Sequence, residues 1–507
     1  MKRSKKSMRN ILAGLFMQFT GIVTGFVLRS VMLNTLGITA ISLNGLFYEV
    51  LAMLSMAELG IGSAITYSLY KPLAEKNDLV ISRYMNLFKD AYRLVCIGML
   101  LIGSLFCPFI HYIIKDINLD LSYIQLIYML FVVQSATTYL FSYKTALIVA
   151  DQKRYIESLV CGIAKIISLI ISIIILLNTH NYVLYLLSTI ILNLCQNICF
   201  SIIADKLYPC LKSNAKLSKE DKKVTFSNIK NMFISKLSSK ITNSTDNILI
   251  STLVGTISVG MYSNYALIIN ACKGIINQVE FSLTASIGNF VNTENTEKTI
   301  NLLYRITYII FLLSLLVCVC LYSVLSDLIT VWLGAEYHIS SFVVLVCMIN
   351  FFLYAMRIPL WQSTTAMGLF KENTFISIVA CVLNFIVSIV CGIKYGMVGI
   401  FLGTTLTFLV QISIKTYYLF TRRLNTSPLS YYIYFGGYCL LGIGTMIIGK
   451  LLCDHINIDN LWLEIITKIC ISFFLACLVG ILPFIRSNSF KYFFNLISNI
   501  SKVFKGV

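Results

Sequence analysis

Fourteen long apolar runs, separated by short polar breaks, dominate this sequence of 507 residues. A helix needs about 20 apolar residues to cross the hydrocarbon core of a bilayer. Only 12% of the residues are charged, whereas a soluble domain has ~25%. The sequence therefore predicts an all-α, polytopic membrane protein with about 14 transmembrane helices. The predicted spans lie near 11-33, 41-69, 92-114, 121-148, 156-178, 181-204, 227-253, 259-287, 302-325, 341-368, 374-393, 397-420, 431-452 and 461-485.

The positions of the basic residues predict the orientation of these spans. Lys and Arg gather in cytoplasmic loops, so the net charge of +18 is interpreted segment by segment. Of the 40 basic residues, 30 fall in loops, in tails or near span ends on one side of the membrane. Three, Lys115, Lys394 and Lys450, fall in loops or near span ends on the other side, and the remaining seven lie deeper within the spans. Both termini are therefore expected in the cytoplasm, and this reading leaves no role for a nucleic-acid partner.

A basic polar segment at 205-226 predicts a division of the chain into two similar halves. At an offset of 218 residues, Leu36-Gly37 aligns with Val254-Gly255 and Lys153 aligns with Lys371. Six spans in each half would make the two lobes parallel, around a central cavity, which is a recurring transporter design. The predicted organisation is a lobe at 1-204, a cytoplasmic linker at 205-226, a second lobe at 227-420, two additional transmembrane helices at 421-485 and a basic amphipathic cytoplasmic tail at 486-507.

Ionisable residues inside the spans are the candidate site residues. An ionised side chain at the centre of a membrane helix costs about 2.5 to 3.5 kcal/mol on insertion scales, so those that persist usually face a cavity or a partner. In the span 227-253, Lys240 belongs to a polar stripe that also contains Lys236 and Asn247. Four deep basic residues are the candidates for binding an anionic head group: Arg29, Lys240, Lys273 and Arg357.

Four acids in the spans leave two alternatives open. They are Glu49, Glu58, Asp246 and Glu280. The acids either pair internally with the basic residues, or they bind a coupling ion, H⁺ or Na⁺, because a carboxylate in a half-dry cavity has its proton affinity raised. The four histidines and sixteen cysteines show no metal-ligand spacing, so we expect no metal or other cofactor. We also find no catalytic constellation, which predicts a transporter and not an enzyme.

Several stretches carry a family resemblance in both halves. They read LNGLFYEVLAMLSMAELGIGSAITYSLYKPLAEKN at 43-77, TDNILISTLVGTISVGMYSNYALI at 245-268, SLTASIGNFV at 282-291, VWLGAEY at 331-337 and GLFKENTFISIVACVLNFIVSIVCGIKYGMVGIFLGT at 368-404. The chain resembles bacterial lipid-linked oligosaccharide flippases, the polysaccharide, O-antigen and teichoic-acid exporters. These belong to the multidrug/oligosaccharidyl-lipid/polysaccharide (MOP) exporter superfamily.

The resemblance implies a function in the cytoplasmic (inner) membrane. A polyprenyl diphosphate-linked oligosaccharide would be translocated by alternating access for cell-surface polysaccharide biosynthesis, including capsule or O-antigen. The implied partners are this lipid-linked cargo, membrane lipid and a polysaccharide polymerase. Two alternatives remain: an ion-coupled multidrug exporter of the same superfamily and a membrane glycosyl polymerase or ligase.

Overall fold

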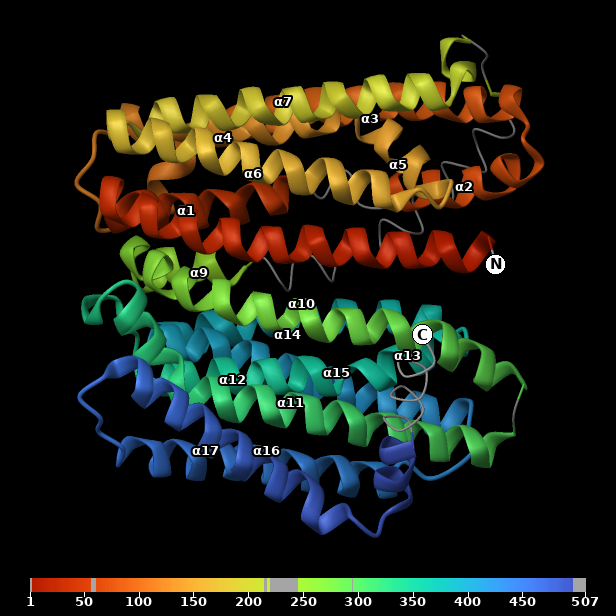
Figure 1. The fold of residues 1–507 in the computed structure, drawn as a ribbon, viewed down its shortest axis with the longest axis vertical. Coiled ribbons are helices and arrows are strands. Elements are labelled where there is room, and N and C mark those ends of the chain that lie inside the picture. Colours follow the sequence, from red (N-terminus) through yellow and green to blue (C-terminus); the bar gives the residue numbers. More distant parts are fainter. Residues whose placement is uncertain (1, 56–60, 214–216, 219–244, 294, 496–507) are drawn as a thin grey trace. The chain divides into compact units, whose positions relative to one another are not determined.

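The protein is an all-helical chain, as a computed structural model shows (Figure 1). The structure describes residues 2–55, 61–213, 217–218, 245–293 and 295–495, and within these ranges all regular secondary structure is helical. Eleven helical segments in the described ranges are long and apolar enough to cross a membrane. The prediction of an all-α polytopic membrane protein is confirmed, and all of the predicted spans except 227–253 are largely covered by described helices.

The chain forms two compact units, Met1–Ser263 and Asn264–Val507. In the first unit, α1 (Lys2–Leu54) contains the first predicted span and the start of the second, joined at a kink at Gly37. Gly37 has φ 76°, a conformation that favours glycine. The other helices of this unit are α2 (Ile61–Glu75), α3 (Asp78–Phe106), α4 (Leu121–Tyr139), α5 (Ser142–Ala150), α6 (Arg154–Thr179), α7 (Tyr182–Leu207) and α9 (Asp246–Leu253).

The second unit is built around two deeply buried helical segments, α11 (Thr296–Trp332) and α12 (Ser341–Met356). The ring of Phe311 on α11 stacks on Tyr438 of α16 with 4.2 Å between the centroids. Helix α10 (Thr256–Thr293) begins in the first unit and continues into the second. The remaining helices are α13 (Ile358–Ala366), α14 (Phe370–Tyr395), α15 (Met397–Arg422), α16 (Leu429–Asp454) and α17 (Leu461–Ile481).

In the described part of the chain, each unit contains a span in which one helix ends and the next begins within three residues. In the first unit, α4 ends at Tyr139 and α5 begins at Ser142, and Phe141 between them is non-helical with φ −127° and ψ 7°. In the second unit, α12 ends at Met356 and α13 begins at Ile358, next to Pro359. A proline lacks the backbone N–H that a continuous helix needs, and this explains the second break. Broken spans expose backbone groups, which are tolerated in a membrane protein only where protein or a cavity surrounds them.

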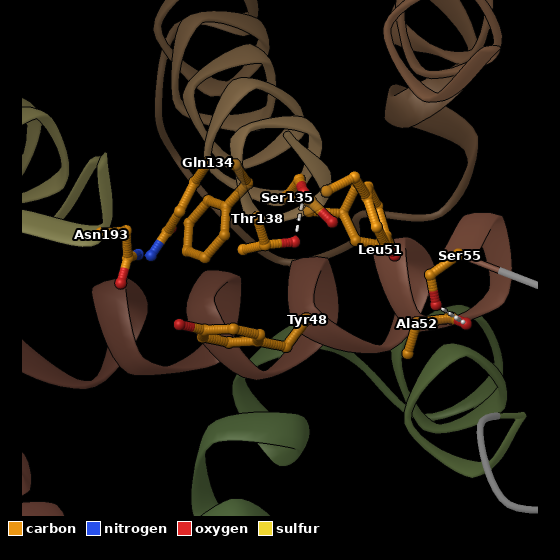
Figure 2. A pocket seen from close by; sticks show the side chains of 10 residues that line it. Tyr48, Leu51, Ala52, Ser55, Gln134, Ser135, Thr138 and Asn193 are labelled. Carbon is orange, nitrogen blue, oxygen red and sulfur yellow. Dashed lines mark hydrogen bonds between the residues drawn. The ribbon is translucent and has the colours of Figure 1, made fainter. Parts of the chain in front are cut away.

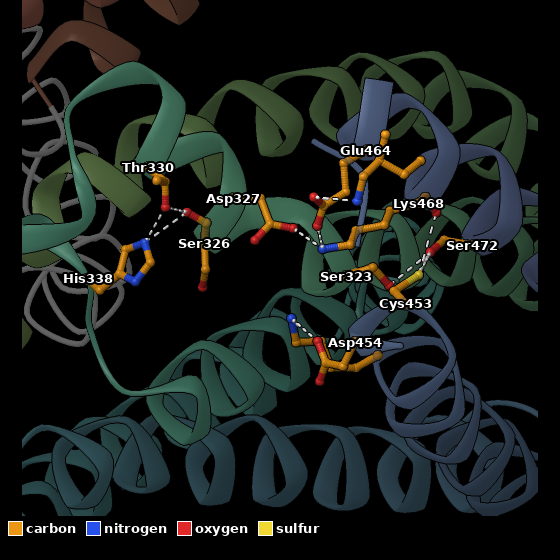
Figure 3. A network of polar contacts seen from close by, with 12 residues as sticks. Ser323, Ser326, Asp327, Thr330, His338, Cys453, Asp454, Glu464, Lys468 and Ser472 are labelled. Carbon is orange, nitrogen blue, oxygen red and sulfur yellow. Dashed lines mark hydrogen bonds and ion pairs between the residues drawn. The ribbon is translucent and has the colours of Figure 1, made fainter. Parts of the chain in front are cut away.

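A polar network joins α16 and α17 to α11 within the second unit (Figure 3). Lys468 of α17 forms ion pairs with Glu464 and with Asp327 of α11, the latter at 2.8 Å. Ser472 donates to Ser323 of α11 at 2.8 Å and lies 3.5 Å from the thiol of Cys453 on α16. Lys468 is therefore a basic residue within a span that is neutralised by internal carboxylates.

The structure describes only parts of the predicted linker and tail. Helix α7 ends at Leu207 and a short 3₁₀ helix follows at Pro209–Lys212. Residues 214–216 and 219–244 lie outside the described ranges, as do 496–507. Residues 488 to 495, at the start of the predicted amphipathic tail, are helical. The boundaries of the linker and of the two lobes stay predictions.

Candidate functional site

Arg357 lies in the second unit, at the break between α12 and α13. The backbone N–H of Arg357 still donates to Leu353 at 3.1 Å, and its carbonyl accepts from Trp361 at 2.9 Å. Arg357 is thus the junction residue between two short helices. Its guanidinium donates to Oε1 of Gln411 on α15 at 3.3 Å.

Three aromatic rings surround the guanidinium of Arg357. The Cζ atom lies 4.7 Å from the ring centroid of Tyr354, 4.9 Å from that of Phe408 and 5.9 Å from that of Trp361. A cation over an aromatic face is stabilised by the ring quadrupole, most strongly where water is excluded. The aromatic rings therefore hold this charge in a largely apolar environment without neutralising it.

Lys415 is a second cation beside the same aromatic group. Its ammonium lies 3.8 Å from the ring centroid of Trp361 and donates a hydrogen bond to Oδ1 of Asn373 on α14. The residue is only 1% exposed. Arg357 and Lys415 thus lie against one indole ring, and in such a low-dielectric environment their charges act together on any nearby ion.

Lys273 of α10 brings a third positive charge to the ring of Tyr354. Its ammonium lies 5.4 Å from that ring centroid, and the Tyr354 hydroxyl donates to Oδ1 of Asn277 at 2.7 Å. We call Lys273, Tyr354, Arg357, Trp361 and Lys415 the cationic cluster.

Two cations of the cationic cluster, Arg357 and Lys415, form no salt bridge with the described acids. Within the described part of the chain, neither Arg357 nor Lys415 lies within 4.0 Å of a carboxylate. Glu280 of α10 acts electrostatically on Arg357, but its Oε1 accepts a hydrogen bond from Gln362 at 2.7 Å. Buried cations that are not paired are costly, so this arrangement favours binding of an anion.

The structure brings two of the four predicted head-group residues together, because Lys273 and Arg357 share the ring of Tyr354. Arg29 lies in the first unit, where its guanidinium donates to the hydroxyl of Ser263. Lys240 lies outside the described residues. All four residues stay predictions as contacts for a head group.

The four predicted ion-coupling acids do not form one described cluster. Glu49 lies on α1, half-buried, and Asp246 lies in the first turn of α9. Both have interactions with other residues. Glu280 is bonded to Gln362, and Glu58 lies outside the described residues. Their role in ion coupling stays a prediction.

Sequence reasoning missed Lys415 and the aromatic rings. Lys415 lies near the end of the predicted span 397–420, so its position groups it with Arg422 and Arg423 among the cytoplasmic basic residues. A signal was present in the spacing, since Gln411 and Lys415 are four residues apart and therefore lie on one helix face. Trp361 has no distinctive sequence pattern around it.

Solved structures with the same fold are transporters and flippases. The lipid II flippase MurJ in an inward closed conformation superimposes with a TM-score of 0.72 at 13% identity, covering 94% of this chain and 98% of that one. An inward-facing multidrug resistance MATE transporter of the MOP superfamily gives 0.64 at 12% identity, covering 80% and 94%. The Vibrio cholerae MATE transporter VcmN gives 0.59 at 13%, covering 83% and 98%. No protein-family model and no curated protein matches the sequence. The chain has the polytopic membrane fold that these proteins share.

Proposed function

We propose that this protein is a flippase that translocates polyprenyl diphosphate-linked oligosaccharides across the cytoplasmic membrane by alternating access. The cargo would serve cell-surface polysaccharide biosynthesis, so the protein would be a transporter and not an enzyme. The likeness in fold to the lipid II flippase MurJ supports a lipid-linked cargo. The cationic cluster is the single observation that carries the proposal.

A diphosphate is the chemical group that the cluster fits best. A guanidinium offers several N–H donors in a planar fork that matches phosphate oxygens. Arg357 has such a fork at a half-buried position, and Lys415, over the ring of Trp361, adds positive charge without needing to touch the ligand. The diphosphate carries the concentrated charge that makes crossing ~30 Å of hydrocarbon unfavourable. A cationic cluster lowers that barrier while the polyprenyl chain stays in lipid.

The other predicted residues would contact the head group at further positions along its route across the membrane. Lys273 lies beside Arg357 and would contact the same head group. Arg29 and Lys240 would contact it elsewhere on its route. Movement requires the head group to be bound with different affinity in the inward and outward states. Glu49, Glu58, Asp246 and Glu280 would supply that difference if H⁺ or Na⁺ drives transport.

The charge of the cluster separates this proposal from a multidrug exporter. An exporter of cationic drugs needs acids and open aromatic faces, because a cation is attracted to them. Here the faces of Tyr354 and Trp361 are already occupied by the protein's own cations. The likeness in fold to MATE transporters does not by itself favour a multidrug exporter over a flippase for lipid-linked cargo. A glycosyl polymerase or ligase receives no support from this arrangement.

Reconstitution into liposomes tests the function directly. The probe is undecaprenyl diphosphate carrying a fluorescent nitrobenzoxadiazole label on its sugar, and external dithionite bleaches only labels that face outward. We expect wild-type protein to accelerate exposure of the label. Arg357→Met should slow it about tenfold or more, because one charge-assisted contact contributes about 1.5–3 kcal/mol.

A matched substitution controls for general damage. Lys394 is exposed at the end of α14, so Lys394→Met should transport at the wild-type rate. The proposal is wrong if wild-type liposomes bleach no faster than empty ones while they extrude a cationic dye such as ethidium. Equal rates for wild type and Arg357→Met would remove the cluster from the mechanism.

A further inference from the structure

The first unit contains a polar cavity system beside its own broken helix. One cavity, of about 330 Å³, lies between α1, α4 and α7 and is lined by Tyr48, Gln134 and Ser135 among others (Figure 2). A second, of about 440 Å³, extends toward α5 and α6. Thr138 and Asn193 line both cavities, so the two are adjacent. We call the pair the amide chamber. Each cavity alone has the size of a small-molecule site.

The lining of the amide chamber is polar but almost uncharged. Side-chain amides come from Gln134 on α4 and from three residues of α7: Asn193, Gln196 and Asn197. Among the described residues that line the two cavities, Glu157 is the single acid, and no lysine or arginine lines them. Glu157 lies 3.8 Å from the guanidinium of Arg154. The chamber therefore offers little to a phosphate or to an organic cation.

Some of these polar groups are fixed by the protein, and others are available. Asn197 donates to the carbonyl of Thr137 at 3.1 Å, and Gln196 donates to the thiol of Cys161 at 3.5 Å. By contrast, the side chains of Asn193, Ser135 and Thr145 make no hydrogen bond to any other described residue. Helical hydroxyls usually bond to a carbonyl one turn back, as Ser142 does to Thr138 at 2.6 Å. An amide and two hydroxyls are thus open to a ligand.

Aromatic rings complete the walls. Tyr48 packs edge to face on Phe131 with 5.3 Å between centroids, and both rings line the first cavity. Tyr92 and Tyr139 stack at 6.4 Å and contribute to the second and first cavities respectively. An amide offers both donors and acceptors, and the rings offer apolar faces. This combination suits a ligand that carries several hydroxyls on an apolar ring and has no net charge.

We propose that the amide chamber binds an uncharged sugar ring of the transported glycan. The inference rests on the proposed function, because it assigns the carbohydrate part of that cargo to the first unit. Asn193 is the central contact, since it lines both cavities and its side chain makes no hydrogen bond to another described residue. The chamber would then recognise the sugar, while the cationic cluster of the second unit recognises the diphosphate.

Native mass spectrometry of the purified full chain tests this division. The probes are undecaprenyl diphosphate alone and the same lipid carrying a neutral disaccharide, made in a hexose and an N-acetylhexosamine form. We expect wild-type protein to bind at least one glycosylated lipid about 3- to 10-fold more tightly than the bare lipid, which is the effect of one or two neutral hydrogen bonds. Asn193→Leu should abolish this advantage and leave binding of the bare lipid unchanged. Arg357→Met should weaken binding of both lipids.

Control variants separate recognition from folding. Asn178 lies near the end of α6 and bonds only within its own helix, so Asn178→Leu should bind every lipid as wild type does. Asn193→Gln keeps the amide and should retain part of the sugar advantage. If Asn193→Leu fails to fold, as judged by size exclusion, Thr145→Val takes its place, because Thr145 also lines the chamber.

Two results would overturn the sugar site while leaving the flippase intact. One is the absence of any advantage for either glycosylated lipid in the wild type. The other is an equal loss of both the bare and the glycosylated lipid in Asn193→Leu. If the wild type binds no diphosphate lipid at all, the proposed function fails separately. Binding of free neutral disaccharides then decides the inference, which is supported if Asn193→Leu weakens it and overturned if none binds.

Discussion

The two broken spans show how one helical scaffold can carry two different chemistries. The α4–α5 break and the α12–α13 break occur about 218 residues apart, which is the offset that the sequence predicts between two similar halves. At the same offset, Asn193 and Asn197 of α7 correspond to Gln411 and Lys415 of α15. In each unit these residues face the break. The first unit has neutral amides there, and the second has an amide and a lysine beside Arg357.

The break itself is structural, and the side chains around it set its chemistry. Exposed backbone at a break must be satisfied by neighbouring groups. In the first unit Asn197 performs this task for the Thr137 carbonyl. In the second unit a proline imposes the break, and Gln411 accepts a hydrogen bond from the guanidinium of Arg357 instead. Substitutions at these residues therefore test whether the two units differ in this way.

The largest effect is expected where both halves depend on a glycine. Gly37 and Gly255 lie 218 residues apart and have φ values of 76° and 144°. Alanine at either position costs about 1–3 kcal/mol of folding free energy, since this conformation is nearly restricted to glycine. Gly255→Ala should lower the melting temperature more, because its Cβ would lie 2.6 Å from Oδ2 of Asp116, whereas a Cβ at Gly37 meets nothing within 4 Å.

Gly14→Ala is the matched control for these two variants. Gly14 lies in α1, has open space around its missing Cβ and has an ordinary helical backbone. Its replacement should leave the melting temperature equal or slightly higher, because alanine favours the helix. If Gly37→Ala and Gly255→Ala melt like Gly14→Ala, neither position depends on glycine, and the predicted repeat loses this structural support.

The next effect distinguishes two buried lysines beside the breaks. Lys144 on α5 forms 2.7 Å hydrogen bonds to Asp205 and Ser201, whereas Lys415 has no carboxylate partner among the described residues. Lys144→Met should therefore cost about 2 kcal/mol in stability, the size of a lost charge-assisted contact, and correctly folded protein should still transport. Lys415→Met should keep the melting temperature within a degree or two and should slow transport of the diphosphate lipid several-fold.

Melting temperature and transport rate are both measured for these two lysine variants in the same lipid. An exposed lysine, Lys394, provides the reference substitution for each assay. A large loss of stability in Lys415→Met, equal to that in Lys144→Met, would mean that Lys415 is a structural residue. The two units would then differ less than their charges indicate.

The sequence predicts the fold well because apolar length alone specifies a membrane helix. The cost of a charge inside an apolar span also selects Arg357 and Lys273 as candidates, since a charge in an apolar run is conspicuous. It did not find the amide chamber, because single amides such as Asn193 and Gln134 hardly interrupt an apolar run. The chamber depends on α4, α5 and α7 meeting at a break, and Phe141 carries no proline or glycine signal for it. Residue spacing on α7, with polar groups at Asn193, Gln196 and Asn197, was the available sign.

The smallest effect concerns what holds the first break open. No proline lies between Tyr139 and Ser142, so the non-helical conformation of Phe141 depends on partners such as Asn197. Asn197→Leu removes a hydrogen bond to the Thr137 carbonyl and should cost about 1 kcal/mol. Much of that cost would be avoided if α4 and α5 joined into one continuous helix. Hydrogen exchange should then show slower exchange of the amides at 140–142, with loss of the sugar advantage in lipid binding.

Asn178→Leu should change neither observable. Faster exchange at 140–142 in Asn197→Leu would mean instead that the break persists without Asn197 and is imposed by packing around Phe141.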